Sequence, residues 1–206
     1  MPSHPQIFDY IRELHFLWRP VFPYLAIQIK ELYGRAHGRI LEMGPFIGVS
    51  RSLFQQKVGD MFFIATFPGG IGRFLKEEIA YNSESLKYTL FETNPSLDAL
   101  KENSVDLVIF RGAFFFPALF IPDIKAIHRV LRAEGVAIVG GGFGKYTPPS
   151  LIEKINERSR ELNILAGKTN ILPETIKTMI SLKGMEDFCE VISEGGLWVI
   201  IRKVNY

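Results

Sequence analysis

The fold of this chain is decided by the stretch Arg39-Ile40-Leu41-Glu42-Met43-Gly44-Pro45-Phe46-Ile47-Gly48-Val49-Ser50. Ile40 and Leu41 predict a short buried strand that ends at the acid Glu42, and a helix is predicted to begin near Ser50. A strand, a glycine turn and a helix can together hold a nucleotide-like ligand. Glycines let the backbone approach the ligand, and the first turn of a helix offers free N–H groups.

Glu42, Gly44 and Gly48 match motif I of the class I S-adenosylmethionine-dependent methyltransferases, which this sequence resembles (methyltransferase type 11-like). The family pattern there is a hydrophobic strand, an acid and then glycines at alternate positions. Phe46 stands where the middle glycine usually is, so motif I is divergent. The resemblance covers roughly residues 36–145, and it depends on the order and spacing of several motifs.

Composition sets limits on the class of protein. The chain has 206 residues, of which 47% are hydrophobic and 22% charged, which suits one globular domain with a sizeable core. The net charge of +2 without a basic run argues against nucleic acid as a partner. The single cysteine, Cys189, excludes an intrachain disulfide and a thiolate metal cluster, so we expect no metal and a cytoplasmic location. We see no secretory signal and no apolar run that could span a bilayer.

Residues 7–33 predict two short helices, because apolar residues recur at helical spacing on both sides of Pro20 and Pro23. In the family that the sequence resembles, such helices often cover the ligand cleft. Aromatic and basic side chains on them are therefore substrate-contact candidates, among them Tyr10, His15 and Trp18. The alternative is that these side chains simply pack on the sheet.

Residues 61–66 form an apolar run bounded by turn residues, which predicts a buried parallel strand. A nucleotide-binding sheet usually carries an acid for the ribose hydroxyls at the end of this strand, but Thr66 or Phe67 stands there. Residues 71–80 predict a helix, and residues 88–91 a third strand. Thr93 or Asn94 after that strand could meet the adenine amino group, or could form the turn before Pro95.

Residues 103–116 are similar to motif IV of the same family, in which an apolar strand leads into a loop that faces the methyl donor. Asp106 lies at the start of this strand, which favours a strand-edge acid over a catalyst. Arg111 and Gly112 lie at the productive end. Arg111 could meet a carboxylate of the cofactor or of the substrate, or could be an exposed loop arginine.

The rest of the chain continues the alternation of helices and strands. Residues 122–131 predict a helix and residues 136–139 a fifth strand, followed by helices over 151–165 and 173–182 and a hairpin over 188–201. The fold class is therefore α/β: a doubly wound, mostly parallel Rossmann-like sheet with a C-terminal antiparallel hairpin strand and N-terminal helices over the cleft. We expect one domain, with a helical cap (1–35), a cofactor-binding core (36–145) and C-terminal helices and hairpin (146–206).

The resemblance implies transfer of a methyl group from S-adenosylmethionine to a small-molecule acceptor. The aromatic residues suit an apolar or aromatic acceptor. The expected cofactor residues are Glu42, Gly44, Pro45, Phe46, Gly48, Thr66, Phe67, Thr93, Asn94, Arg111 and Gly112. The substrate candidates are Tyr10, His15, Trp18, Phe114, Phe115 and Tyr146. No catalytic base is assigned, and the positional candidates are His15, Tyr10, His37 and Tyr146.

Two other classes of function stay open. Phe46 and the missing ribose acid are also what a decayed cofactor site would show, which would leave a non-catalytic methyltransferase-like binding or assembly protein. Phenylalanine-rich surface could then serve a partner or a homodimer contact. A dinucleotide-binding oxidoreductase is the third alternative, and the glycine fingerprint of that class fails at Phe46.

Overall fold

The computed structural model describes residues 4–72 and 88–204. Its strands are β1 (Arg39–Met43), β2 (Met61–Thr66), β3 (Tyr88–Glu92), β4 (Val105–Arg111), β5 (Leu131–Gly141), β6 (Cys189–Ile192) and β7 (Leu197–Arg202). They form a single sheet in the order β3-β2-β1-β4-β5-β7-β6. The pairs from β3 to β5 are parallel, whereas β7 pairs antiparallel with both β5 and β6. The predicted mostly parallel sheet and its antiparallel C-terminal hairpin are therefore confirmed.

The helices are α1 (His4–Trp18), α2 (Phe22–Tyr33), α3 (Val49–Gln55), α5 (Ile124–Val130), α6 (Pro149–Leu165) and α7 (Pro173–Ser181), and a short 3₁₀ helix spans Glu186–Phe188. The predicted helix over residues 71–80 lies outside the described residues except for its first two positions. No helix in the described ranges is long and apolar enough to cross a bilayer. The same ranges bring no three metal-ligating side chains together.

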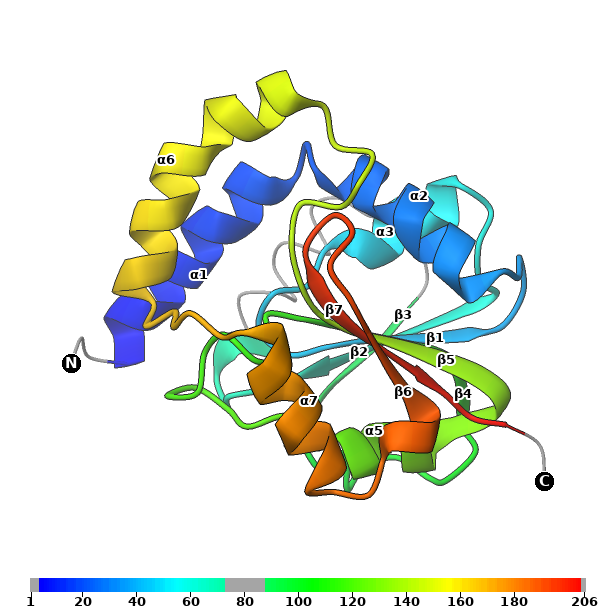
Figure 1. The fold of residues 1–206 in the computed structure, drawn as a ribbon. Coiled ribbons are helices and arrows are strands. Elements are labelled where there is room, and N and C mark those ends of the chain that lie inside the picture. The colour runs from blue at the N-terminus through cyan, green and yellow to red at the C-terminus, as the bar shows by residue number, and fades with distance from the viewer. Residues whose placement is uncertain (1–3, 73–87, 205–206) are drawn as a thin grey trace.

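Helices cover both faces of the sheet (Figure 1). All residues of β4 are buried, and alternate ones point to opposite faces. Leu107 and Ile109 pack in the cluster that includes α2 and α3, while Val108 and Phe110 pack in the cluster that includes α5 and α7. A central strand buried on both faces explains why its sequence is a continuous apolar run rather than an alternating one.

The helices α1 and α6 lie side by side beyond the end of the sheet (Figure 1, blue and yellow). Hydrogen bonds of two residue pairs help to join them. The Arg158 guanidinium donates to the Glu13 carboxylate at 2.6 Å, and the Trp18 indole N–H donates to the Ser159 hydroxyl at 2.8 Å. The predicted helices over the cleft are thus present, and α6 from the C-terminal part of the chain completes the cover.

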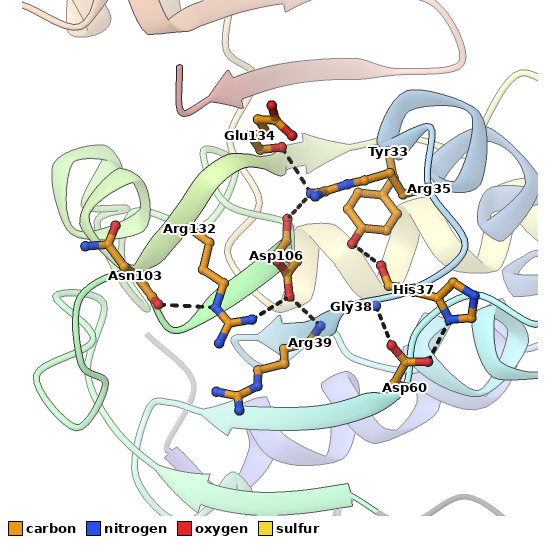
Figure 2. A network of polar contacts seen from close by, with 10 residues as sticks. All are labelled: Tyr33, Arg35, His37, Gly38, Arg39, Asp60, Asn103, Asp106, Arg132 and Glu134. Atoms are coloured by element: carbon orange, nitrogen blue, oxygen red, sulfur yellow. Dashed lines mark hydrogen bonds and ion pairs between the residues drawn. The ribbon is translucent and has the colours of Figure 1, made fainter. Parts of the chain in front are cut away.

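The amino end of the sheet is held by a polar network (Figure 2). One carboxylate oxygen of Asp106, at the start of β4, accepts from the Arg39 backbone N–H at 2.8 Å and lies 3.6 Å from the Arg132 guanidinium. Arg35 donates to the backbone oxygens of Asp106 and Glu134. These contacts tie β1 and β4 to Arg132 and Glu134 of β5. Asp106 is therefore a structural acid at the start of its strand, as the sequence predicts.

We expect Asp106→Ala to destabilise the protein. The change leaves the Arg39 N–H without its acceptor in a mostly buried position, which costs about 1–3 kcal/mol of unfolding free energy. Urea denaturation measures the loss. Asp98→Ala is the matched control, because Asp98 is an exposed acid that contacts Asn94, and its removal should change stability by no more than ~0.5 kcal/mol. Equal denaturation midpoints for the two variants would contradict this role of Asp106.

Candidate cofactor and substrate site

Glu42 holds the turn between β1 and α3. The residue is 1% exposed. One carboxylate oxygen accepts from the N–H groups of Gly48 (2.8 Å) and Val49 (3.0 Å). The other accepts from the N–H (3.0 Å) and the hydroxyl (2.7 Å) of Ser50. A carboxylate at a helix N-terminus satisfies free backbone donors and interacts favourably with the helix dipole. Glu42 is therefore fully used in fixing the path of the chain through this turn.

Aromatic rings of the chain fill the spaces beside the glycines of this edge. Gly44 has φ +92°, and a Cβ there would lie 2.8 Å from the Phe110 ring. Gly112 has φ +77°, and a Cβ there would lie 2.5 Å from the Phe46 ring. Glycine is needed at both positions for backbone conformation and for space. The Phe116 ring also borders this position, 3.3 Å from the same Cβ, and its centroid lies 4.4 Å from that of Phe46.

A cavity of about 590 Å³ lies at the carboxyl end of β1, β4 and β5, under α1 and α6. The turn after β1 contributes Phe46 and Ile47, and the end of β4 contributes Arg111 and Gly112. β1 and β4 are neighbours at the point where the strand order reverses, which is where open α/β sheets bind ligands. The other lining residues are Ile11, Leu14, His15, Trp18, Phe22, Phe115, Phe116, Gly141, Gly142, Phe143, Asn156, Ser159, Arg160, Asn163, Ile164, Lys168, Asn170, Ile171 and Leu197.

Arg111 is the most buried charged group of this cavity, with 7% of the residue exposed. Its guanidinium carbon lies 4.8 Å from the ring centroids of both Trp18 and Phe22, and Nη1 donates to the backbone oxygen of Phe46 at 3.2 Å. Burial lowers the pKa of Arg111 to about 10, against an opposing effect of the Glu42 charge. The guanidinium therefore stays protonated at neutral pH. The structure excludes the alternative of an exposed loop arginine.

The wall opposite the sheet combines aromatic and polar groups. The Trp18 ring stacks on the Phe143 ring with centroids 4.6 Å apart, which joins α1 to the loop after β5. The Lys168 ammonium lies 5.2 Å from the centroid of Phe115. Lys168 is exposed as a residue, but desolvation still lowers the pKa of its ammonium. Such a wall can bind a ligand that has both an apolar body and a polar end.

The His15 ring also borders the cavity, and the backbone holds it in place. Its Nδ1 lies 3.0 Å from the carbonyl oxygen of Ile47. A carbonyl only accepts hydrogen bonds, so Nδ1 carries the hydrogen and Nε2 is the accepting nitrogen of the neutral ring. Of the positional candidates for a base, Tyr10, His37 and Tyr146 do not line this cavity, whereas His15 does.

The structure brings some of the predicted site residues together and separates others. The cavity is lined by Phe46, Arg111, Gly112, His15, Trp18 and Phe115. Tyr10 is half-buried against the core, Phe114 belongs to the core, and Tyr146 is exposed on the surface, where its hydroxyl donates to Glu31. The remaining predicted cofactor residues lie outside the cavity, namely Glu42, Gly44, Pro45, Gly48, Thr66, Phe67, Thr93 and Asn94.

The residues at the end of β2, where the family pattern has the ribose acid, are buried. Thr66 and Phe67 are 0% and 2% exposed, and the Phe67 ring packs edge-on against Phe110 and Phe120. Thr93 is half-buried, while Asn94 is exposed and donates to Asp98. The carboxylate of this edge belongs to Glu92, which pairs in register with Thr66 and accepts from the Gly70 N–H at 3.3 Å.

Sequence reasoning missed the part of the cavity that α6 supplies. Asn156, Ser159, Arg160 and Asn163 come from that helix, which the sequence presents only as a charged amphipathic segment. Ser159 is buried within it and accepts the Trp18 indole N–H. A small polar residue on the apolar face of a charged helix was the available signal, since such a residue needs a buried partner.

Comparisons with known proteins give structural matches only. No family model matches the chain, and no curated protein matches its sequence. The structure is similar to a Methanococcus maripaludis protein assigned as an S-adenosyl-L-methionine-dependent methyltransferase, with a TM-score of 0.75, 21% identity, and 100% of this chain and 98% of that chain covered. It is also similar to a SAM-dependent methyltransferase from Aquifex aeolicus, with a TM-score of 0.58, 12% identity, and 93% and 96% covered.

A third match is human N-acetylserotonin methyltransferase in complex with SAM, with a TM-score of 0.61 and 13% identity. That match covers 98% of this chain and 57% of the human one. The chain has the class I S-adenosylmethionine-dependent methyltransferase fold. The structural similarity establishes the architecture, but the sequence identities are too low to transfer an activity. The activity has to be argued from the site.

We expect Glu42→Gln to lower the free energy of unfolding by about 2–4 kcal/mol, because a buried carboxylate with four donors becomes an amide that turns an N–H toward some of them. Guanidinium denaturation checks this loss. Glu92→Gln is the control, since Glu92 is exposed and, in the part of the chain that the structure describes, accepts a long hydrogen bond from the Gly70 N–H. A Glu42→Gln protein as stable as the control would show that the turn does not need the carboxylate.

Proposed function

We propose that this protein binds S-adenosylmethionine at the carboxyl edge of its sheet and transfers the methyl group to a small-molecule acceptor in the cavity. The observation that carries the proposal is the position of the cavity. It lies at the β1–β4 switch point of a methyltransferase fold, between the motif I turn at Phe46 and the motif IV end at Arg111 and Gly112. Its volume of about 590 Å³ is in the range of small-ligand sites.

The cofactor would supply a methyl group that its sulfonium already activates, so the protein needs mainly to align the acceptor and exclude water. Glu42 keeps the motif I turn in one conformation through its bonds to α3. The aromatic walls around Trp18 and Phe115 exclude water. His15 lines the cavity and is the positional candidate for a base if the acceptor has to lose a proton, whereas a soft or ionised nucleophile needs no base.

The fit of the cofactor to these residues is uneven. The turn backbone and Gly112 fit a ligand that needs close backbone approach, once the Phe46 ring leaves its place over Gly112. The ribose edge lacks an acid at Thr66, although Glu92 on the neighbouring strand brings a carboxylate beside it. Glu42, Gly44, Pro45 and Gly48 therefore enter the proposal as residues that shape the turn. Thr66, Phe67, Thr93 and Asn94 enter it only as the edge on which the adenosine would rest.

The alternative function is a non-catalytic binding protein with the methyltransferase fold. One observation favours it: the Phe67 ring, which follows the position of the usual ribose acid, is 2% exposed and packs edge-on against Phe110 and Phe120. Under this alternative the cavity under α1 and α6 binds a ligand or partner group without methyl transfer. Cytoplasmic location, a homodimer and the absence of a nucleic-acid partner remain predictions under either function.

Calorimetric titration with S-adenosylmethionine and S-adenosylhomocysteine tests the proposal, after mass spectrometry has excluded copurified ligand. We expect the wild-type protein to bind both. Phe46→Ala should bind S-adenosylhomocysteine roughly 3- to 10-fold more tightly, because the ligand no longer has to displace a ring contact worth about 1 kcal/mol.

Phe54→Ala is the control for this experiment. Phe54 is a partly exposed ring on the outer side of α3 that contacts Phe62, so its removal should leave the affinity unchanged. If the folded, ligand-free wild-type protein binds neither cofactor form, the methyl-transfer proposal fails in favour of the non-catalytic alternative. If Phe46→Ala weakens binding instead, the ring is part of the ligand site rather than an obstacle.

A further inference from the structure

The cavity contains a buried cation, Arg111, that forms no ion pair with an acid in the described ranges. Arg111 has five N–H donors, and one of them bonds the Phe46 carbonyl. The guanidinium carbon also lies 4.8 Å from the ring centroids of Trp18 and Phe22. The neighbouring acid is Glu42, whose oxygens already serve the N-terminus of α3. Burying a charge without a partner costs free energy, so a ligand that supplies the counter-charge gains affinity here.

The charged side chains among the described lining residues are all cations. Arg160 and Lys168 join Arg111 in the lining, and the described lining residues include no aspartate or glutamate. Arg160 has no ion pair to any described residue, in contrast to Arg158 on the same helix, which pairs with Glu13 and Glu161. Cations gathered in a cleft with low-dielectric aromatic walls raise the local concentration of anions.

The chemistry of the anion follows from burial. Arg111 is held at the floor of the cavity between the sheet end and the rings of α1 and α2. A carboxylate bonds a guanidinium bidentately, and as a monoanion it loses less hydration on burial than a phosphate dianion. The walls around it are the rings of Phe46, Phe115 and Phe116, which favour an apolar body attached to the carboxylate.

We propose that the ligand of this cavity is a small carboxylic acid with an apolar body, and that its carboxylate pairs with Arg111. The inference rests on the proposed function only in taking this acid to be the methyl acceptor. The cofactor also carries a carboxylate, but Gly44 and Gly48 of the motif I turn do not line the cavity, whereas Arg160 and Lys168 extend its positive lining toward α6. This placement favours the acceptor as the source of the carboxylate.

The test uses 3-phenylpropionate as the probe, with 3-phenylpropanamide as its neutral counterpart and phenyl phosphate as the alternative anion. Trp18 borders the cavity, and the other tryptophan, Trp198, is 1% exposed in the core, so quenching of intrinsic fluorescence reports binding. Calorimetry provides a second readout. We expect the wild-type protein to bind the propionate at least about 30-fold more tightly than the amide, as a desolvated charge pair implies.

Arg111→Met keeps the length and apolar stem of the side chain and removes its charge. It should weaken propionate binding at least about 30-fold and leave amide binding within roughly 3-fold. The melting temperature should stay equal or rise, because an unpaired buried charge is lost, and this separates loss of binding from loss of folding. Arg35→Met is the matched control, since Arg35 lies in the network at the opposite end of the sheet (Figure 2) and should change neither affinity.

The remaining arms distinguish the sources of the anion. Arg111→Met should bind S-adenosylhomocysteine as the wild type does. If the variant loses S-adenosylhomocysteine but keeps 5′-methylthioadenosine, which lacks the carboxylate, Arg111 serves the cofactor and the inference is overturned. Preference for phenyl phosphate, or equal binding of acid and amide, also overturns it. Propionate binding without any cofactor binding would refute methyl transfer and leave the carboxylate site standing.

Discussion

The interaction on which the rest of this structure depends is the bond between the Glu42 carboxylate and the first turn of α3. It fixes where β1 ends and where α3 begins. The turn held between them presents the Phe46 carbonyl to Arg111, and Arg111 in turn contacts rings from α1 and α2. A single buried acid thus links the central strand to the N-terminal helices. Motif I acts here as a framework in addition to any part it plays in ligand binding.

Around that framework the chain has used aromatic rings where a nucleotide-binding sheet usually leaves space. Phe46 lies on Gly112, Phe110 lies on Gly44, and Phe67 packs into the core at the end of β2. The glycines keep their backbone conformations, and the rings occupy the space beside them. The carboxyl edge is therefore unequal: Thr66 and Phe67 at the end of β2 are buried, whereas residues at the ends of β4 and β5 line the cavity. The fold is shared with methyltransferases, whereas the distribution of open space is a property of this chain.

The sheet was predictable from sequence because each strand is marked by a pattern of neighbouring residues. The apolar runs of β2 and β4 and the hairpin turn at Gly195 and Gly196 are visible in short windows, so β1, β2, β3, β6 and β7 were placed to within about a residue. The fifth strand was wrong at its start: β5 begins at Leu131, inside the predicted helix and five residues before the predicted strand. The cavity was predictable only in part. Phe46, Arg111 and Gly112 follow from motif order, but the burial of Arg111 depends on rings more than eighty residues away along the chain, and sequence pattern does not carry that pairing. The α6 wall escaped prediction for the same reason.

The hydrogen bonds between α1 and α6 have a consequence for the order in which the protein folds. Its contacts join residues 145 and 141 positions apart, from Glu13 to Arg158 and from Trp18 to Ser159. Closing such long loops costs conformational entropy, so we expect these contacts to form late in folding, after local structure has formed. During synthesis from the N-terminus, the parallel part of the sheet precedes α6. The cavity is therefore among the last features to form, since a growing chain acquires strands β1 to β5 before α6, and the cavity also needs Leu197 of β7.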